Sequence, residues 1–154
     1  DVAALVATEY PEIRVIGIDF SVAMATQKHS GIANLSFQKG YALEILESRT
    51  LRGDILWASG TVSDFTPREL HRYLAIISKI FCHIIISEPI WGRHVVQMNG
   101  PPFSEHLEDA TWFHDYLLYA KHYGYSIDYV EHEPYKHPIS TRSDVQQLIA
   151  SGSK

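Results

Sequence analysis

The chain has 154 residues, of which 45% are hydrophobic, and its formal net charge is −5. This length suits one domain with a substantial core, and an acidic balance without a basic run argues against nucleic acid as the main partner. No stretch approaches the roughly 20 apolar residues that cross a bilayer, so no membrane partner is expected. The single cysteine, Cys82, excludes an internal disulfide and suits a reducing compartment, so we expect a cytoplasmic protein.

The first third of the chain alternates helical and strand patterns. Residues 1–9 carry apolar side chains at helical spacing and end before a proline. Residues 13–19 are apolar and β-branched, which predicts a buried parallel strand, and Ser21 stands where the N-cap of the next helix belongs. Residues 34–38 form the next strand candidate.

The rest of the chain continues this alternation. Strands are predicted at residues 54–58, 82–87 and 125–131. Thr66, Pro67 and Glu69 form a capping box with proline at the first helical position, which predicts a helix to about residue 79. Residues 145–150 fit either a short helix capped by Ser143 or Asp144 or a strand.

The alternation predicts an α/β fold, with a mostly parallel twisted sheet covered by helices on both faces. We expect residues 1–150 to form this domain and residues 151–154 to form a tail. Residues 88–102 are rich in glycine, proline, histidine and polar residues, which suggests a lid over the substrate at residues 88–108, although a variable surface loop has the same composition. A helix is predicted from Ser104 or Asp109 to His122, with its inward side chains at Trp112, Tyr116, Leu117 and Ala120.

The acid at the end of the first strand is the most informative residue. A carboxylate at the carboxyl end of a parallel strand lies at the edge where α/β folds bind ligands. There Asp19 could accept hydrogen bonds from two ribose hydroxyls, or it could merely cap a turn.

Five short stretches then follow one another in an informative order. The strand and acid at 17–21 are followed by a strand end at 37–42, a strand and loop at 54–60, a strand ending in Ser87-Glu88-Pro89, and a glycine-aromatic turn at 123–127. In this order they resemble the class I S-adenosylmethionine-dependent methyltransferases. The resemblance implies a Rossmann-like fold whose last strand, here residues 145–150, is antiparallel.

The resemblance also implies S-adenosylmethionine as cofactor and transfer of its methyl group to a small-molecule acceptor. Asp19 matches the acid that holds the cofactor ribose, whereas Tyr41 stands where an adenine-binding acid is usual. The implied cofactor-binding set is Asp19, Phe20, Met24, Tyr41, Ala42, Ser59 and Gly60.

The acceptor side is predicted from residue chemistry near the lid. Imidazole or carboxylate groups can remove a proton from an oxygen or nitrogen acceptor, so the catalytic candidates are His94, His114 and Glu88. Each histidine could equally be a solvated loop residue. The candidate substrate-binding residues are the aromatic side chains of Trp91, Trp112 and Tyr116. His132 and His137 match no strong zinc spacing, so no metal is expected.

One departure from the family concerns the start of the chain. The first strand of the family and its glycine-rich loop have no counterpart here, and that strand is central in the sheet, between the second and fourth. We therefore expect a missing N-terminal segment, or a second copy in a homodimer, to complete the sheet.

Two alternative functions stay open: a catalytically silent methyltransferase-like binding or scaffold module, and an NAD(P)-dependent oxidoreductase domain that uses Asp19 on a different ribose.

Overall fold

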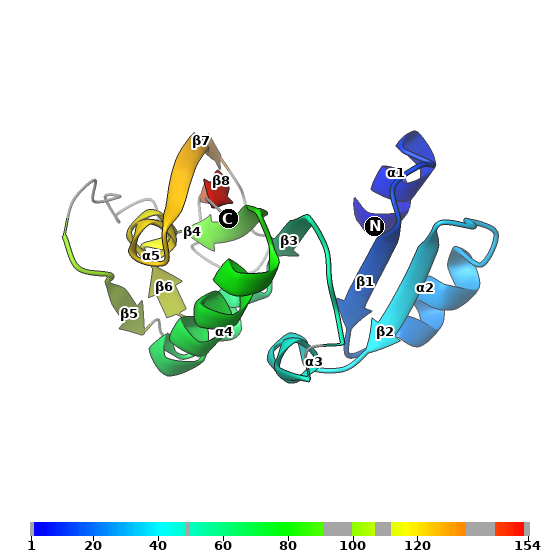
Figure 1. Cartoon of the computed structure of the whole chain (residues 1–154), viewed down its shortest axis with the longest axis horizontal. Coiled ribbons are helices and arrows are strands. Elements are labelled where there is room, and N and C mark those ends of the chain that lie inside the picture. The colour runs from blue at the N-terminus through cyan, green and yellow to red at the C-terminus, as the bar shows by residue number, and fades with distance from the viewer. Residues whose placement is uncertain (1, 49, 91–99, 107–111, 135–143, 153–154) are drawn as a thin grey trace. The chain divides into compact units, whose positions relative to one another are not determined.

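The computed structural model describes residues 2–48, 50–90, 100–106, 112–134 and 144–152. The chain divides into two compact units, Asp1–Leu51 and Arg52–Lys154 (Figure 1). Because each unit has its own core, each is described by itself.

The first unit is a pair of parallel strands with helices. It contains α1 (Val2–Glu9), β1 (Val15–Asp19), α2 (Val22–Lys28), β2 (Leu35–Lys39) and α3 (Ala42–Glu47). β1 and β2 pair in parallel, from Val15 opposite Leu35 to Asp19 opposite Lys39. The ring of Phe37 lies so close to Gly17 that a Cβ there would stand 2.6 Å from it, which explains a glycine within the strand.

A side-chain amide fixes how α1 leads into β1. Asn34 Nδ2 lies 2.9 Å from the carbonyl oxygen of Ala7, 3.2 Å from that of Tyr10 and 2.8 Å from that of Ile13. The amide thus donates to carbonyls at the end of a helix, where the backbone has no partner within the helix. This contact holds the turn that places Asp19 at the far end of β1.

The second unit is built on a mixed sheet with the strand order β3-β4-β8-β7. Its strands are β3 (Ile55–Ser59), β4 (His83–Ile90), β7 (Tyr125–Pro134) and β8 (Asp144–Gly152). β3 and β4 are parallel, and β8 runs antiparallel to both β4 and β7. The predicted antiparallel last strand is therefore confirmed, and β8 includes Ser151 and Gly152 of the expected tail.

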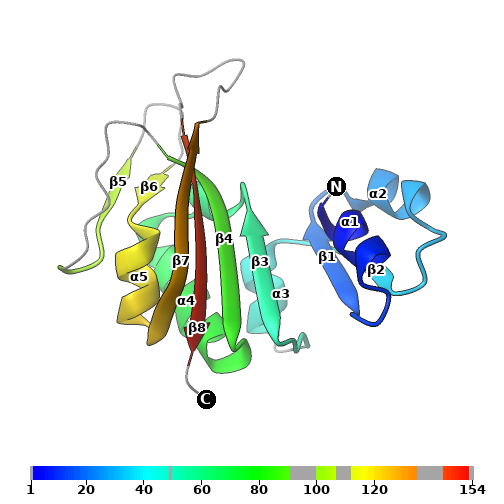
Figure 2. The ribbon, with the colours of Figure 1, turned by 90° about the horizontal axis from the view of Figure 1, so that it is seen from above.

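Helices α4 (Pro67–Ile80) and α5 (Tyr116–His122) lie on the same face of this sheet (Figures 1 and 2). The capping box predicted for α4 is present, since Thr66 Oγ1 accepts from the Glu69 amide and the Glu69 carboxylate accepts from the Thr66 amide. The buried side of α4 consists of Leu70, Tyr73, Leu74 and Ile77. A short 3-10 helix, η1 (Val62–Asp64), connects β3 to α4.

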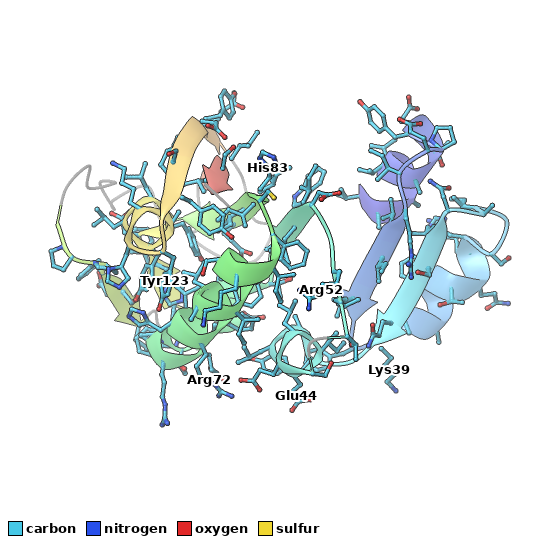
Figure 3. The ribbon with its side chains drawn as sticks, viewed as in Figure 1. Lys39, Glu44, Arg52, Arg72, His83 and Tyr123 are labelled. Atoms are coloured by element: carbon cyan, nitrogen blue, oxygen red, sulfur yellow. The ribbon has the colours of Figure 1, made fainter. Side chains whose placement is uncertain are left out.

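The opposite face of the sheet carries an apolar row. Trp57 pairs with Ile85, and Ile149 lies opposite both Ile85 and Tyr129. Trp57 and Tyr129 keep 47% and 46% of their surface exposed. Near the end of this face lies His83, which Figure 3 labels. Its Nδ1 is 3.0 Å from Ser151 Oγ, which in turn donates to Asp128.

The helix predicted between residues 104 and 122 is only partly correct. The structure instead has a hairpin, β5 (Ser104–His106) with β6 (Trp112–His114), and α5 begins only at Tyr116. The true N-cap is Asp115, whose carboxylate accepts from the Leu118 amide. Tyr116, Leu117 and Ala120 are buried as predicted, whereas Trp112 lies on a strand, as suits adjacent aromatic residues.

The other element predictions agree with the structure within a few residues. The chain is α/β, and residues 145–150 are strand rather than helix. The sheets are smaller and more mixed than the single parallel sheet expected, with two parallel strands in the first unit and four mixed strands in the second. Helices of the second unit cover one face of its sheet among the described residues, not both.

Candidate functional site

Asp19 ends β1 with its carboxylate exposed to solvent. Its Oδ1 accepts a hydrogen bond from the backbone amide of Ser21 at 2.7 Å, and no described residue donates to Oδ2. Ser21 is the residue before α2, as predicted, but its hydroxyl makes no capping hydrogen bond. The carboxylate, not the hydroxyl, therefore orders this turn, and one oxygen of Asp19 remains for a ligand.

A stacked aromatic pair, an exposed Phe20 on a half-buried Tyr41, follows this carboxylate. The rings of Phe20 and Tyr41 are stacked, with centroids 5.6 Å apart and planes 16° from parallel. Phe20 keeps 64% of its surface exposed, although aromatic side chains usually stabilise a fold or an interface by being buried. The main chain joins the two residues closely, because the Gly40 amide donates to the Asp19 carbonyl at 3.1 Å. Ala42 begins α3 directly after Tyr41.

In the second unit, Ser59 ends β3 and Gly60 follows it, and the two residues are called here the Ser59–Gly60 turn. Both residues are exposed, and Gly60 has a φ of 62°, a backbone conformation that favours glycine. The Gly60 amide donates to the Ser87 carbonyl at 3.1 Å, and the Thr61 hydroxyl donates to the Ser59 carbonyl at 3.2 Å. The turn is thus tied to the neighbouring strand β4.

Glu88 lies under this turn and is fully buried. Its Oε1 accepts from the amides of Thr61 at 2.9 Å and Val62 at 2.8 Å, and its Oε2 accepts from the amide of Ser63 at 3.4 Å. Burial raises the pKa of Glu88 above its usual value, while these hydrogen bonds act in the opposite direction. Glu88 also raises the pKa of the buried Tyr73, an effect second to that of burial itself.

His114 is also fully buried and is held at both ring nitrogens. Nε2 lies 2.9 Å from the carbonyl oxygen of Phe65, so it carries the proton in the neutral ring, because a carbonyl only accepts. Nδ1 then accepts from Ser104 Oγ at 2.7 Å, and Ser104 Oγ lies 2.7 Å from the Tyr119 hydroxyl. Burial lowers the pKa of His114 to about 4.

Of the other predicted residues of the acceptor side, Trp112 and Tyr116 both have their rings against that of His114, and the rest lie outside the described residues. Trp91 and His94 lie outside the described residues, as does the side chain of Met24. Trp112 is half-buried and stacks at 6.3 Å on His114, and Tyr116 is buried. Among the described residues no three potential metal ligands gather, and no helix is long and apolar enough to span a membrane.

Sequence reasoning did not identify the partners of these buried groups. Ser104, Tyr119 and the carbonyl of Phe65 hold His114 through contacts across 10 to 49 positions in the chain. The amides of 61–63 reach Glu88 across 25 to 27 positions. No local pattern reports such distant contacts. The pairing of Phe20 with Tyr41 had a signal, because Phe20 directly follows the predicted strand 13–19 and Tyr41 comes two residues after the predicted strand 34–38.

Comparison with solved structures relates this architecture to one class of protein. The chain resembles an S-adenosylmethionine-dependent methyltransferase from Methanosarcina mazei at 12% identity and a TM-score of 0.62, over 90% of this chain and 81% of that one. It resembles the pyocyanin biosynthetic protein PhzM at 13% identity and a TM-score of 0.66, over 96% of this chain and 46% of that one. No protein-family model matches the sequence, and no curated protein matches it either.

A third similar structure contains ligands. The 1,6-didemethyltoxoflavin-N1-methyltransferase of Burkholderia thailandensis, with 1,6-didemethyltoxoflavin and S-adenosylhomocysteine bound, matches at 11% identity and a TM-score of 0.57, over 99% of this chain and 77% of that one. The chain therefore has the fold of class I S-adenosylmethionine-dependent methyltransferases. At this level of identity the similarity concerns the fold.

Proposed function

We propose that this protein binds S-adenosylmethionine and transfers its methyl group to a small-molecule acceptor. The observation that carries the proposal is the exposed edge of the first unit, where the Asp19 carboxylate stands beside the stacked rings of Phe20 and Tyr41. In a methyltransferase fold, this edge is the carboxyl end of parallel strands, where α/β proteins bind ligands.

The residues at this edge fit the nucleoside part of the cofactor. Asp19 would accept hydrogen bonds from ribose hydroxyls through Oδ2, while Oδ1 stays bound to the Ser21 amide and fixes the carboxylate. Phe20 and Tyr41 offer aromatic surface for a purine base, which replaces the charged contact that an acid at position 41 would make. Met24 and Ala42 complete the proposed adenine site.

The second unit also contains residues that the resemblance assigns to cofactor binding. The exposed Ser59–Gly60 turn is proposed to lie near the transferred methyl group. The reason is that residues 54–60 resemble the strand and loop of the family that face this group. The bound cofactor supplies an activated methyl group on a sulfonium. The residues of this chain need chiefly to align the acceptor with it and exclude water.

The acceptor is proposed to be a small molecule because the similar structures include a methyltransferase with 1,6-didemethyltoxoflavin bound. Trp91 and Trp112 are proposed to contact it. A proton-removing role for His94, His114 or Glu88 stays a prediction, and Tyr116 stays a predicted substrate residue. In the described conformation the side chains of Glu88, His114 and Tyr116 are buried, so direct contact with an acceptor requires them to become accessible.

We also propose that a further strand completes the sheet. β1 and β3 each have one edge without a strand partner among the described residues, and on β3 the side chains of Ile55 and Trp57 are 56% and 47% exposed. Unpaired strand edges with apolar side chains favour pairing with another strand. A further N-terminal segment or a second copy would supply it, and the proposal predicts lower stability without it.

The test is calorimetric titration with S-adenosylhomocysteine, of this chain and of a longer form that carries the additional strand. Asp19→Asn should weaken binding roughly 10–100-fold, because a hydrogen bond to a charged group contributes about 1.5–3 kcal/mol. Asp54→Asn, at another exposed aspartate, is the control and should bind normally.

The outcomes separate the three candidate functions. Binding that Asp19→Asn weakens and Asp54→Asn preserves supports the proposal. If neither form binds S-adenosylhomocysteine although both are folded, the cofactor assignment is wrong and a silent binding module is favoured. Binding of NAD(P) in its place would favour the oxidoreductase.

A further inference from the structure

The turn after β3 is held by a carboxylate of its own chain. Three consecutive backbone amides, those of Thr61, Val62 and Ser63, point at the two oxygens of Glu88 at 2.9, 2.8 and 3.4 Å. These amides begin the 3-10 helix Val62–Asp64, so they have no acceptor within that helix. The Glu88 carboxylate supplies the acceptor that they lack.

Burial and hydrogen bonding act in opposite directions on the charge of this carboxyl group. Glu88 is 0% exposed, and an isolated buried charge would be strongly unfavourable. Every group that hydrogen-bonds to it is a donor, namely the three amides and the Ser63 side chain, and donors favour the ionised form. The titratable group that faces it from α4 is the buried phenol of Tyr73.

The same contacts tie the turn to strand β4 at two successive residues. Ser87 accepts from the Gly60 amide, and Glu88 accepts from the next three amides. Because β4 lies within the sheet between β3 and β8, it is a rigid support for the turn. The exposed Ser59–Gly60 turn is therefore followed directly by three amides that a buried residue, 28 positions after Gly60, holds in place.

We infer that Glu88 is a positioning residue: through the amides of residues 61–63 it fixes the Ser59–Gly60 turn in the conformation that receives the cofactor and acceptor. This inference rests on the proposed function for the role of the turn. The link between Glu88 and the turn rests on the hydrogen bonds alone. The two can therefore be tested separately.

The first experiment uses the unmodified chain and follows the Glu88 carboxyl carbon and the backbone amides by NMR as the pH is lowered. The amide protons of Thr61 and Val62 should shift with the same midpoint as the Glu88 carboxyl carbon. Thr66 is an internal control, because its amide is bound to Glu69 at 2.9 Å and should follow that carboxyl instead. Amides 61 and 62 that do not respond to Glu88 overturn the inference.

The second experiment uses Glu88→Gln, which keeps the shape but places an amide donor against backbone donors. Exchange of the Thr61–Ser63 amides with deuterium should accelerate at least tenfold, and S-adenosylhomocysteine affinity should fall about tenfold. The matched control is Tyr125→Phe, which removes a buried hydrogen bond to the Phe81 carbonyl at the other end of the sheet. It should lower stability while leaving these amides and the affinity unchanged.

The two readouts distinguish failure of the inference from failure of the proposed function. Unchanged exchange at residues 61–63 in Glu88→Gln overturns the positioning role. A loss of affinity that Tyr125→Phe reproduces also overturns it, because general destabilisation would then explain the result. Accelerated exchange in Glu88→Gln, with no S-adenosylhomocysteine binding by the unmodified chain, supports the link to the turn and contradicts the proposed function.

Discussion

Two acids of this protein belong to parallel strands, and they have opposite surroundings. Asp19, in the first unit, is exposed and accepts one amide hydrogen bond. Glu88, in the second unit, is fully buried and accepts from three amides. The comparison shows that an acid near the end of a strand can keep an oxygen open to solvent or can use both oxygens to bind its own chain. Which of the two it does depends on how many internal donors surround it.

An aromatic residue of the first unit and a histidine of the second unit differ in the same way, one exposed and the other buried. Beside Asp19, Phe20 remains exposed on Tyr41. In the second unit, His114 is buried and both of its ring nitrogens have partners. Asp19 and Phe20 of the first unit are thus exposed, whereas Glu88 and His114 of the second unit are buried and hydrogen-bonded within the chain.

The largest expected effect concerns the buried side of this comparison. The pKa of His114 is lowered to about 4 from an ordinary value of 6.5, so the folded protein keeps the ring neutral where the unfolded chain protonates it. Keeping His114 neutral therefore adds its full contribution to the unfolding free energy above pH 6.5. This contribution is lost as the pH falls from 6.5 to about 4. The loss amounts to roughly 3 kcal/mol.

Urea unfolding of the unmodified chain and of His114→Leu between pH 8 and 4 measures this loss. The difference in unfolding free energy between the two proteins should change by roughly 3 kcal/mol over that range, because only the unmodified chain keeps the buried imidazole. His106→Leu, at an exposed histidine, is the control. A difference between the first two proteins that is independent of pH contradicts the buried neutral state.

A smaller effect is expected on the exposed side. Phe20→Ala should weaken S-adenosylhomocysteine binding about tenfold, within the roughly 1–3 kcal/mol that stacking of a base on an aromatic ring contributes. It should leave the unfolding free energy almost unchanged, because the Phe20 ring is mostly exposed. Calorimetry and urea unfolding measure the two quantities. Tyr10→Ala, at another exposed aromatic residue of the first unit, should change the affinity little.

The smallest effect tests whether local capping in the second unit is separable from ligand binding. Thr66→Ala removes the capping box of α4 and should lower the unfolding free energy by about 1 kcal/mol. Cofactor affinity should not change, because Thr66 lies after the turn that Glu88 holds. An affinity loss comparable to that of Glu88→Gln would mean that the turn depends on the whole helix entry instead of on Glu88.

Local patterns predicted most of the elements for identifiable reasons. The capping box at Thr66 and the β-branched run before Asp19 depend on residues close in sequence, and both were correct. The start of α5 was wrong because Ser104 and Asp109 are as suitable for a cap as Asp115. Ser104 instead begins a hairpin, which forms because two strands pair, and no local cap signal reveals that pairing.

The sequence by itself determined the α/β alternation and identified Asp19 as a candidate cofactor-binding residue. Periodicity, capping and strand ends are short-range properties. Only the tertiary structure decided that Glu88 and His114 are buried, that Phe20 stacks on Tyr41, and that the strands divide between two units. Burial and hydrogen-bond partners depend on which distant segments meet. The chemistry of a carboxylate or imidazole therefore changes with contacts that its neighbours in sequence do not specify.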